Sequence, residues 1–251
     1  MRRPRVADAR SGTQQVYGVS AKAGAAAPRP QAVIVISAHW ESSVQLVSTP
    51  VRYRTMHDFF GYPEELYGIE YPARGDIARA LQVRAPLQAA GIACETDDAR
   101  GLDHGAWSVL KLMYPQADIP VVAMSVQPRL VPEEQYRIGH ALAPLREQGV
   151  LILGSGGTVH NLQRLEWSDR GVLGWALGFD EWLAEQLETW NTEALFHYEA
   201  QAPQAREAVP TPEHLAPPLI AMGTAHRGKK ARPLHREYQL GTLSLSCWMM
   251  G

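Results

Sequence analysis

The sequence predicts a single α/β domain with a mostly parallel central sheet that helices cover on both faces. The first observation is a set of three apolar runs rich in β-branched residues, AVIVISA (residues 32–38), VVAMSV (121–126) and VLILGSG (150–156). Continuous apolar runs of this length are typical of strands buried on both faces. The second observation is that helical patterns separate these runs, and such alternation produces parallel strands joined by helical crossovers.

Four segments carry the helical patterns: residues 75–91, 104–114, 132–149 and 175–190. The first three end at or near a glycine or a proline, which are common helix stop signals. These helices supply the two layers that a parallel sheet requires.

The C-terminal part predicts one more helix and one more strand. Thr211 fits the N-cap position of a helix with Pro212 as its first residue, although Pro217 and Pro218 are expected to kink or delay that helix. Residues 238–250 alternate in polarity and are predicted to form a final strand.

The composition is that of a soluble globular protein with one domain. The chain has 251 residues, of which 45% are hydrophobic and 20% charged, and its net charge is -2. The near-neutral charge argues against nucleic-acid or membrane partners. The two cysteines, Cys94 and Cys247, are too far apart for a thiolate zinc motif or a disulfide framework. We expect a cytoplasmic monomer or small homo-oligomer that acts on a small molecule.

The N-terminal segment differs from the rest of the chain. Residues 1–30 are rich in arginine, alanine and glycine and show little periodicity, so we expect a divergent, poorly ordered segment there. The folded domain is expected to span residues 31–251.

Five of the nine histidines lie at the ends of predicted elements: His39, His57, His104, His160 and His214. His39 follows the first predicted strand and His160 the third, where ligands of such sheets gather. Each histidine could instead be structural, with its ring bonded to the main chain. No spacing matches a local ligand motif such as HExxH, so the residues alone leave both interpretations open.

Other chemistries have less support. The GSGG stretch (residues 154–157) lacks the lysine of a P-loop and the spacing of a dinucleotide fingerprint, and a flexible turn is the simpler interpretation. Ser155 is not in a GxSxG elbow. The seven tryptophans and the Phe59-Phe60 pair are typical of a core, or of an aromatic wall around a ring-shaped substrate.

Five motifs, in this order, resemble the DODA-type branch of the LigB-like extradiol ring-opening dioxygenases. They are PRPQAVIVISAHW, HDFFGYPEELYGIEYPARG, GLDHGAWSVLKLMYPQADIPVV, GVLILGSGGTVHNL and PTPEHL, and the resemblance runs from about Pro28 to the C-terminus. It implies a LigB-like fold and a non-haem enzyme that uses one divalent metal, Fe(II) or Zn(II). The implied partners are O2 and a small aromatic diol such as DOPA, which would be opened to a muconic semialdehyde.

The resemblance also implies roles for the five histidines. His57 of the HDF motif and His214 of TPEH would be metal ligands, and His160 of VHN would be at the metal as a catalytic acid/base or a further ligand. His104 of GLDHGAW would act in catalysis and bind the substrate, and His39 of SAHW would lie beside the substrate. Neutral imidazole suits Fe(II) and Zn(II), and a histidine can exchange protons near neutral pH.

The sequence departs from the family pattern in two places. No GHGSP-like turn, whose histidine is a metal ligand in relatives, precedes the first strand, and Val209 stands where many relatives have a histidine. Glu213 is the nearest reserve donor. These departures keep two alternatives open, a zinc-binding hydrolase-like relative and a catalytically impaired family member.

Overall fold

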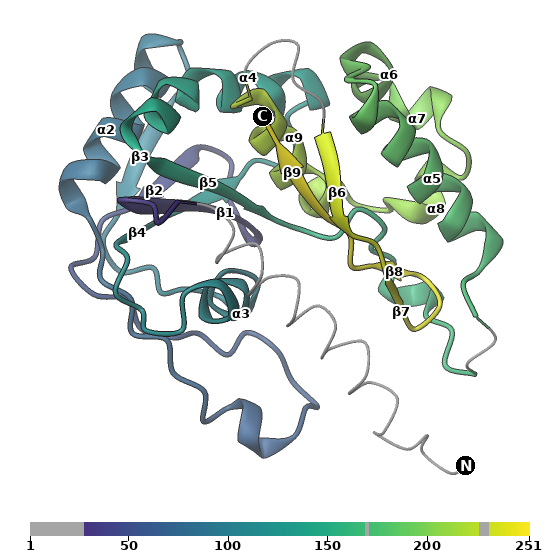
Figure 1. Cartoon of the computed structure of the whole chain (residues 1–251), viewed down its shortest axis with the longest axis horizontal. Helices are drawn as coiled ribbons and strands as arrows, with labels where there is room; N and C mark the ends of the chain where they lie inside the picture. Colours follow the sequence, from purple (N-terminus) through teal and green to yellow (C-terminus); the bar gives the residue numbers. More distant parts are fainter. Residues whose placement is uncertain (1–27, 169–170, 226–230) are drawn as a thin grey trace.

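The computed structural model describes residues 28–168, 171–225 and 231–251 (Figure 1). Its centre is a five-stranded sheet in the order β3-β2-β4-β1-β5. The three predicted strands are β1 (Ala32–Glu41), β4 (Val121–Val126) and β5 (Val150–Ser155). β1 lies between β4 and β5 and runs parallel to both, which confirms the mostly parallel sheet.

The burial of these strands follows their place in the sheet. Every residue of β4 is buried, as are most of β1, because both strands have neighbours on each side. In β5, which lies at the edge of the described sheet, only Val150 is buried and the other residues are partly exposed. The expectation of full burial on both faces is therefore wrong for β5.

Two strands were not predicted, β2 (Gln45–Ser48) and β3 (Cys94–Asp97). β2 pairs parallel with β3 and antiparallel with β4, through Val47 and Met124. Their sequences, QLVS and CETD, are short and partly polar, so they lack the continuous apolar run of the central strands.

Helices cover both faces of the sheet (Figure 1). On one face lie α2 (Ile77–Ala89), α4 (Pro132–Leu142) and α9 (Ala216–Gly223). On the other lies α3 (His104–Met113). Alternate residues of the central strands divide between the two layers, as the pleat of a strand requires: Ile34, Ile36, Val122 and Met124 belong to the first core, and Val33, Val35, Val121 and Ala123 to the second.

A third core packs beside the sheet, around α5 (Gly174–Glu188). The remaining short elements are α6 (Thr192–Phe196), α7 (Tyr198–Gln201), α8 (Ala205–Ala208), η1 (Glu64–Leu66), η2 (Ala143–Gln148), η3 (Leu162–Arg164) and η4 (Pro212–His214). The helix predicted over residues 132–149 is thus α4 followed by the tighter 3₁₀ turn η2, which ends at Gly149 with a φ of 70°. The helix predicted from Thr211 begins as η4 and continues as α9, as its prolines indicated.

The prediction of one strand over residues 238–250 is wrong. The segment forms β7 (Tyr238–Gln239), β8 (Leu243–Ser244) and β9 (Cys247–Met250), and β9 pairs with β6 (Ala231–His235). A turn between β7 and β8 breaks the alternation. No helix in the described parts of the chain is long and apolar enough to cross a membrane. The expectation for residues 1–30 falls almost wholly outside the described residues, since only residues 28–30 are included.

Candidate active site

His39 lies at the carboxyl end of β1, and a buried polar network fixes its main chain. Its N–H donates to Ser37 Oγ (3.3 Å), and its carbonyl accepts from Arg100 Nη2 (3.1 Å). Both partners are held in turn by Asp103, which accepts from Ser37 Oγ (2.6 Å) and from Arg100 Nη2 (2.9 Å). Because Asp103 is only 2% exposed, these charge-assisted bonds are shielded from water and hold the strand end in one place.

His104 is brought to the same place as the first residue of α3. Asp103 is the N-cap of this helix and accepts from Ala106 N–H. The His39 and His104 rings lie with centroids 4.1 Å apart. Gly105 makes this approach possible, because a Cβ there would lie 2.7 Å from Cδ2 of His39.

The carboxylate of Asp58 faces one nitrogen of each of these two rings. Its Oδ1 accepts the main-chain N–H of His104 (2.7 Å) and lies 3.0 Å from His104 Nδ1, while Oδ2 lies 3.6 Å from His39 Nδ1. Burial alone would raise the pKa of Asp58, but its hydrogen bonds to His104 and the attraction of that ring outweigh burial and lower the pKa to about 2. Asp58 is therefore a carboxylate at neutral pH.

His160 and His214 form the other half of the site. His160 is in the loop after β5 and His214 ends η4, and their rings stack with centroids 3.4 Å apart and planes 18° apart. The glycines of the GSGG stretch permit this approach: a Cβ on Gly156 would overlap the carbonyl of His214, and one on Gly154 would lie 2.5 Å from the carbonyl of Pro217. Close packing against the main chain is therefore the observed role of Gly154 and Gly156.

The His160 loop is anchored on its far side by a buried carboxylate. Thr158 Oγ1 donates to Asp180, which also accepts from Arg236 Nη2, Tyr238 OH and Ser244 Oγ at 2.7–3.1 Å. Asp180 is 2% exposed and comes from α5, so four donors from distant segments meet at one buried charge. The network joins the C-terminal strands to the loop that carries His160.

Burial lowers the pKa of three site histidines, which favours their neutral form. Burial, with His160 and then the other imidazoles adding repulsion, lowers the pKa of His214 to about 2. Burial also lowers the pKa of His160, and burial together with the neighbouring His104 lowers that of His39. Neutral imidazoles can donate a lone pair to a metal, which a protonated ring cannot.

The donor set fits a divalent metal. Ligand atoms of His160, Glu213 and His214 lie within 4.8 Å of one another, and the His39 ring lies edge-on to His214 with centroids 5.2 Å apart. His214 Nδ1 now accepts from the main-chain N–H of Gly157 (3.1 Å). A neutral imidazole has one lone pair, so binding a metal through His214 requires the ring to give up this bond.

His57 is not in either group of clustered ligand atoms, and its role as a metal ligand stays a prediction. Its Nε2 lies 3.0 Å from the carbonyl oxygen of Ile69, and its ring is surrounded by Phe59, Tyr67 and Trp107 at centroid distances of 5.8–6.1 Å. The described groups of clustered ligand atoms contain four of the five predicted histidines and not His57. The neighbouring residue, Asp58, faces the site instead, and it was not among the predicted site residues. The adjacent His and Asp of the HDF motif were its only sequence signal.

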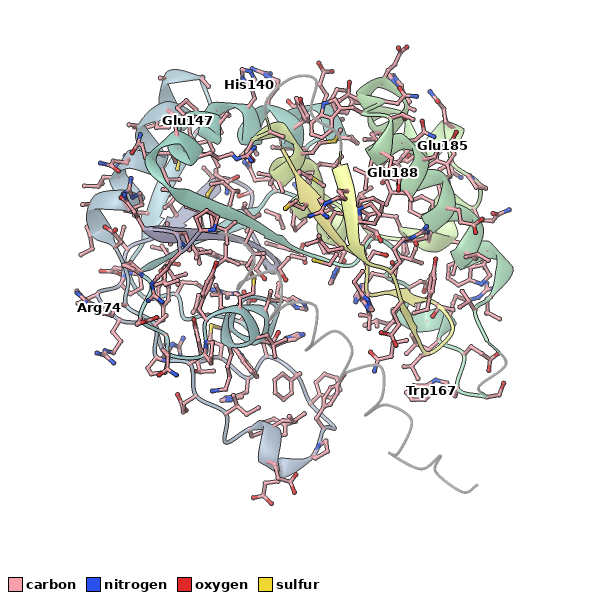
Figure 2. The ribbon with its side chains drawn as sticks, in the orientation of Figure 1. Arg74, His140, Glu147, Trp167, Glu185 and Glu188 are labelled. Atoms are coloured by element: carbon pink, nitrogen blue, oxygen red, sulfur yellow. The ribbon has the colours of Figure 1, made fainter. Side chains whose placement is uncertain are left out.

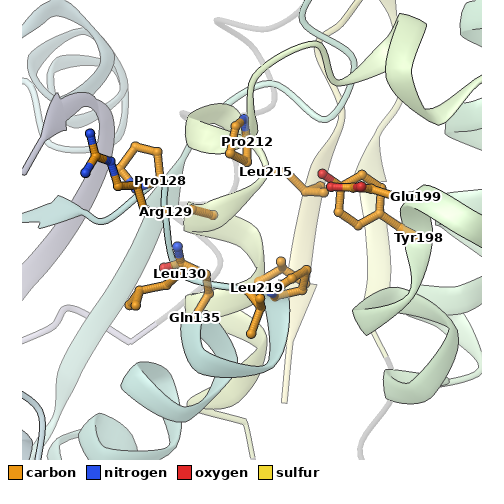
Figure 3. A pocket seen from close by; sticks show the side chains of 12 residues that line it. Pro128, Arg129, Leu130, Gln135, Tyr198, Glu199, Pro212, Leu215 and Leu219 are labelled. Atoms are coloured by element: carbon orange, nitrogen blue, oxygen red, sulfur yellow. The ribbon is translucent and has the colours of Figure 1, made fainter. Parts of the chain in front are cut away.

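Phe59 extends the site with an aromatic wall. Its ring lies edge-on to His104, with centroids 5.5 Å apart and planes 89° apart, and it contacts Tyr62 and Tyr67. A separate pocket of about 170 Å³ is lined by the turn after β4 and by residues of α4, η4, α7 and α9 (Figure 3). None of the five predicted histidines lines that pocket.

Comparisons with known proteins agree with this architecture. Residues 7–246 match the family model described as the catalytic LigB subunit of aromatic ring-opening dioxygenase. The 4,5-DOPA dioxygenase extradiol of Beta vulgaris is 42% identical over 217 residues, which cover 86% of this chain and 81% of the relative. The protein of that name from Escherichia coli K12 is 36% identical over 239 residues, which cover 92% and 86%.

A solved structure shares the fold. The crystal structure of an uncharacterized protein from Escherichia coli K12 superposes with a TM-score of 0.81 at 30% identity, covering 94% of this chain and 92% of that one. The match to the family model spans nearly the whole chain and includes all the histidines described above. This chain belongs to the LigB family of aromatic ring-opening dioxygenases.

Proposed function

We propose that this protein is a non-haem, metal-dependent extradiol dioxygenase that opens the ring of DOPA-like catechols to muconic semialdehydes. The observation that carries the proposal is the convergence of four desolvated or carboxylate-paired histidines, His39, His104, His160 and His214, at the carboxyl ends of β1 and β5. The relatives named 4,5-DOPA dioxygenase extradiol support the substrate class.

We propose that His160, His214 and His39 hold the metal, with Fe(II) as the native ion. His39 is favoured as the third donor because its main chain is fixed at both N–H and carbonyl and Gly105 leaves room for its ring. Glu213 is the competing donor, since its carboxylate already lies near both other rings. When bound, such a metal supplies adjacent positions for the catechol oxygens and O2, which converts an encounter of two substrates into a local event.

We assign the transfer of the catechol proton to side chains of the protein. His104 is assigned as the base that takes a proton from the catechol hydroxyl and later returns it, because the proposed ligand His160 has no lone pair left for a proton. His104, whose ring is partly exposed, is assigned a hydrogen bond to a substrate oxygen. Phe59, packed edge-on against His104, supplies an apolar surface for the substrate ring and helps to exclude water.

The assignment is tested by adding DOPA and O2 to the protein loaded anaerobically with Fe(II). We expect one O2 consumed per DOPA, and both atoms of ¹⁸O2 in a muconic semialdehyde identified by mass spectrometry. His104→Gln should lower kcat by about two to four orders of magnitude, the usual effect of removing a positioned acid/base. His140→Gln, on the outer side of α4 (Figure 2), is the matched control. No ring opening with Fe(II), Mn(II) or Zn(II), or a product cleaved between the two hydroxyl groups, would refute the proposal.

The metal ligands are tested separately by titrating the protein with Zn(II). Loss of affinity in His39→Ala, with affinity retained in Glu213→Gln, supports the three-histidine site. The opposite result makes Glu213 the third ligand.

We also propose a cytoplasmic location, which the small number of cysteines supports, and a monomer or small homo-oligomer.

A further inference from the structure

We propose that Asp58 is a positioning residue that holds His104 and His39 in the tautomer protonated on Nδ1, so that Nε2 of each ring is the nitrogen left free for the reaction. The importance of Asp58 for catalysis rests on the proposed function. The tautomers themselves can be measured without any turnover.

The contacts of Asp58 place one carboxylate against both rings. Oδ1 lies 3.0 Å from Nδ1 of His104, and Oδ2 lies 3.6 Å from Nδ1 of His39. His104 Nδ1 is inaccessible to solvent and has no well-aligned hydrogen-bond partner. A carboxylate can only accept, so the arrangement favours a proton on each facing nitrogen. A small rotation of the His104 ring would align its N–H with Oδ1.

The carboxylate is itself fixed in place. Its Oδ1 accepts the main-chain N–H of His104 at 2.7 Å, which anchors Asp58 at the N-terminus of α3. A negative charge there is favoured by the unpaired N–H groups and the dipole of the helix. Asp58 is not the N-cap residue, because Asp103 has that position and bonds Ala106 N–H. The helix start is therefore already secured, and the second carboxylate is available for the two imidazoles.

The tautomer determines what each ring can do. A neutral imidazole carries its lone pair on the nitrogen that has no proton, so a proton fixed on Nδ1 leaves the lone pair on Nε2. Ligating histidines in proteins commonly donate their other N–H to a carboxylate, which orients the ring and raises its basicity. Asp58 would give this support to His39 as a ligand and to His104 as the residue facing the substrate.

The replacement Asp58→Asn should affect the His104 and His39 rings differently. The amide oxygen can keep the bond to the main-chain N–H of His104, which turns the amide NH2 toward His39. An NH2 group donates, so His39 is expected to move its proton from Nδ1 to Nε2. Glu65→Gln is the matched control, because it makes the same carboxylate-to-amide change at an exposed position in η1 of the same connecting segment.

Long-range ¹H–¹⁵N spectra of the metal-free full chain, at about pH 8 where neutral imidazole predominates, report the tautomers directly. His39→Gln and His104→Gln assign the signals. In the wild type we expect both rings protonated on Nδ1, and in Asp58→Asn we expect His39 to change tautomer, with no change in Glu65→Gln. Both rings protonated on Nε2 in the wild type would overturn the proposal, even if the variant fails to fold. An unchanged His39 tautomer in a folded Asp58→Asn variant would also overturn it.

Measurements of activity provide a second test of the role of Asp58. With Fe(II) bound, Asp58→Asn should lower kcat/KM for DOPA by about 10- to 100-fold, the usual effect of losing a residue that orients a ligand. Asp58→Glu should recover part of this loss, and Asp58→Ala should not. Wild-type protein that shows the expected tautomers but opens no catechol would refute the proposed function and leave the role of Asp58 intact.

Discussion

The replacement His214→Gln should make the metal-free protein less sensitive to acid. His214 is 8% exposed, and burial together with the neighbouring imidazoles lowers its pKa from 6.5 to about 2. In the unfolded chain the ring takes up a proton below its ordinary pKa, while in the folded protein it stays neutral. Unfolding therefore binds a proton in this range, and the free energy of unfolding falls as the pH falls below about 6.5.

The size of the effect follows from the two pKa values. Each pH unit between them costs about 1.4 kcal/mol per proton, so lowering the pH from 7 to about 4.5 should cost the wild type about 2.5 kcal/mol through His214. Gln cannot take up this proton, and its side-chain oxygen can still accept from Gly157 N–H. The variant should lack most of this pH dependence. His39 and His160 contribute to both proteins, so the difference isolates His214.

Urea unfolding of both proteins after removal of metal, at several pH values between about 4.5 and 7, measures the effect as a difference in the free energy of unfolding. His140→Gln, at the surface of α4 (Figure 2), should follow the wild type. Parallel curves for the wild type and His214→Gln would show that His214 is protonated in the folded protein. The neutral-imidazole argument for the metal site would then fail.

Three further predictions follow from the packing of the site. Gly105→Ala should displace the His39 ring, destabilise the protein by about 1 to 3 kcal/mol as overpacking does, and lower DOPA turnover at least about tenfold. Asp180→Ala leaves an arginine and three hydroxyl groups without their shared acceptor and should lower the free energy of unfolding by about 3 kcal/mol, measured in urea. His57→Asn should bind Zn(II) within about threefold of the wild type, whereas His214→Asn should lose at least about tenfold by calorimetry. Equal losses in the last two variants would place His57 at the metal.

The central strands could be predicted because burial on both faces requires a continuous run of apolar residues. β1 and β4 are enclosed by neighbours and helices, so nearly every position must be apolar. β2 and β3 lie toward the edge, where short strands with polar residues suffice, and nothing in QLVS or CETD distinguishes them from loop. Residues 238–250 misled the prediction in the opposite direction. Their alternation of polarity continues across the turn between β7 and β8, so the sequence suggested one strand where the structure has three.

The positions of site residues near strand ends could be predicted from the sequence. Those in the irregular segment that contains His57 and Asp58 could not. His39 lies near the carboxyl end of β1 and His160 in the loop after its parallel neighbour β5, so topology alone brings them to one edge. His57 and Asp58 lie in a segment without regular structure, where no periodicity says which of two adjacent side chains faces inward. The family motif favoured His57, and the structure turns Asp58 toward His39 and His104.

The glycines explain how residues distant in sequence come to share one site. His214 lies 54 residues after His160, and their stacking depends on η4 and α9 approaching the end of β5 more closely than a side chain would allow. Gly154 and Gly156 provide that approach, as Gly105 does for His39 and α3. In the sequence, GSGG has the glycines of a phosphate-binding loop without its lysine or its spacing. Here the group that approaches the glycines is the main chain of the protein itself, and the result is the stacked pair of His160 and His214.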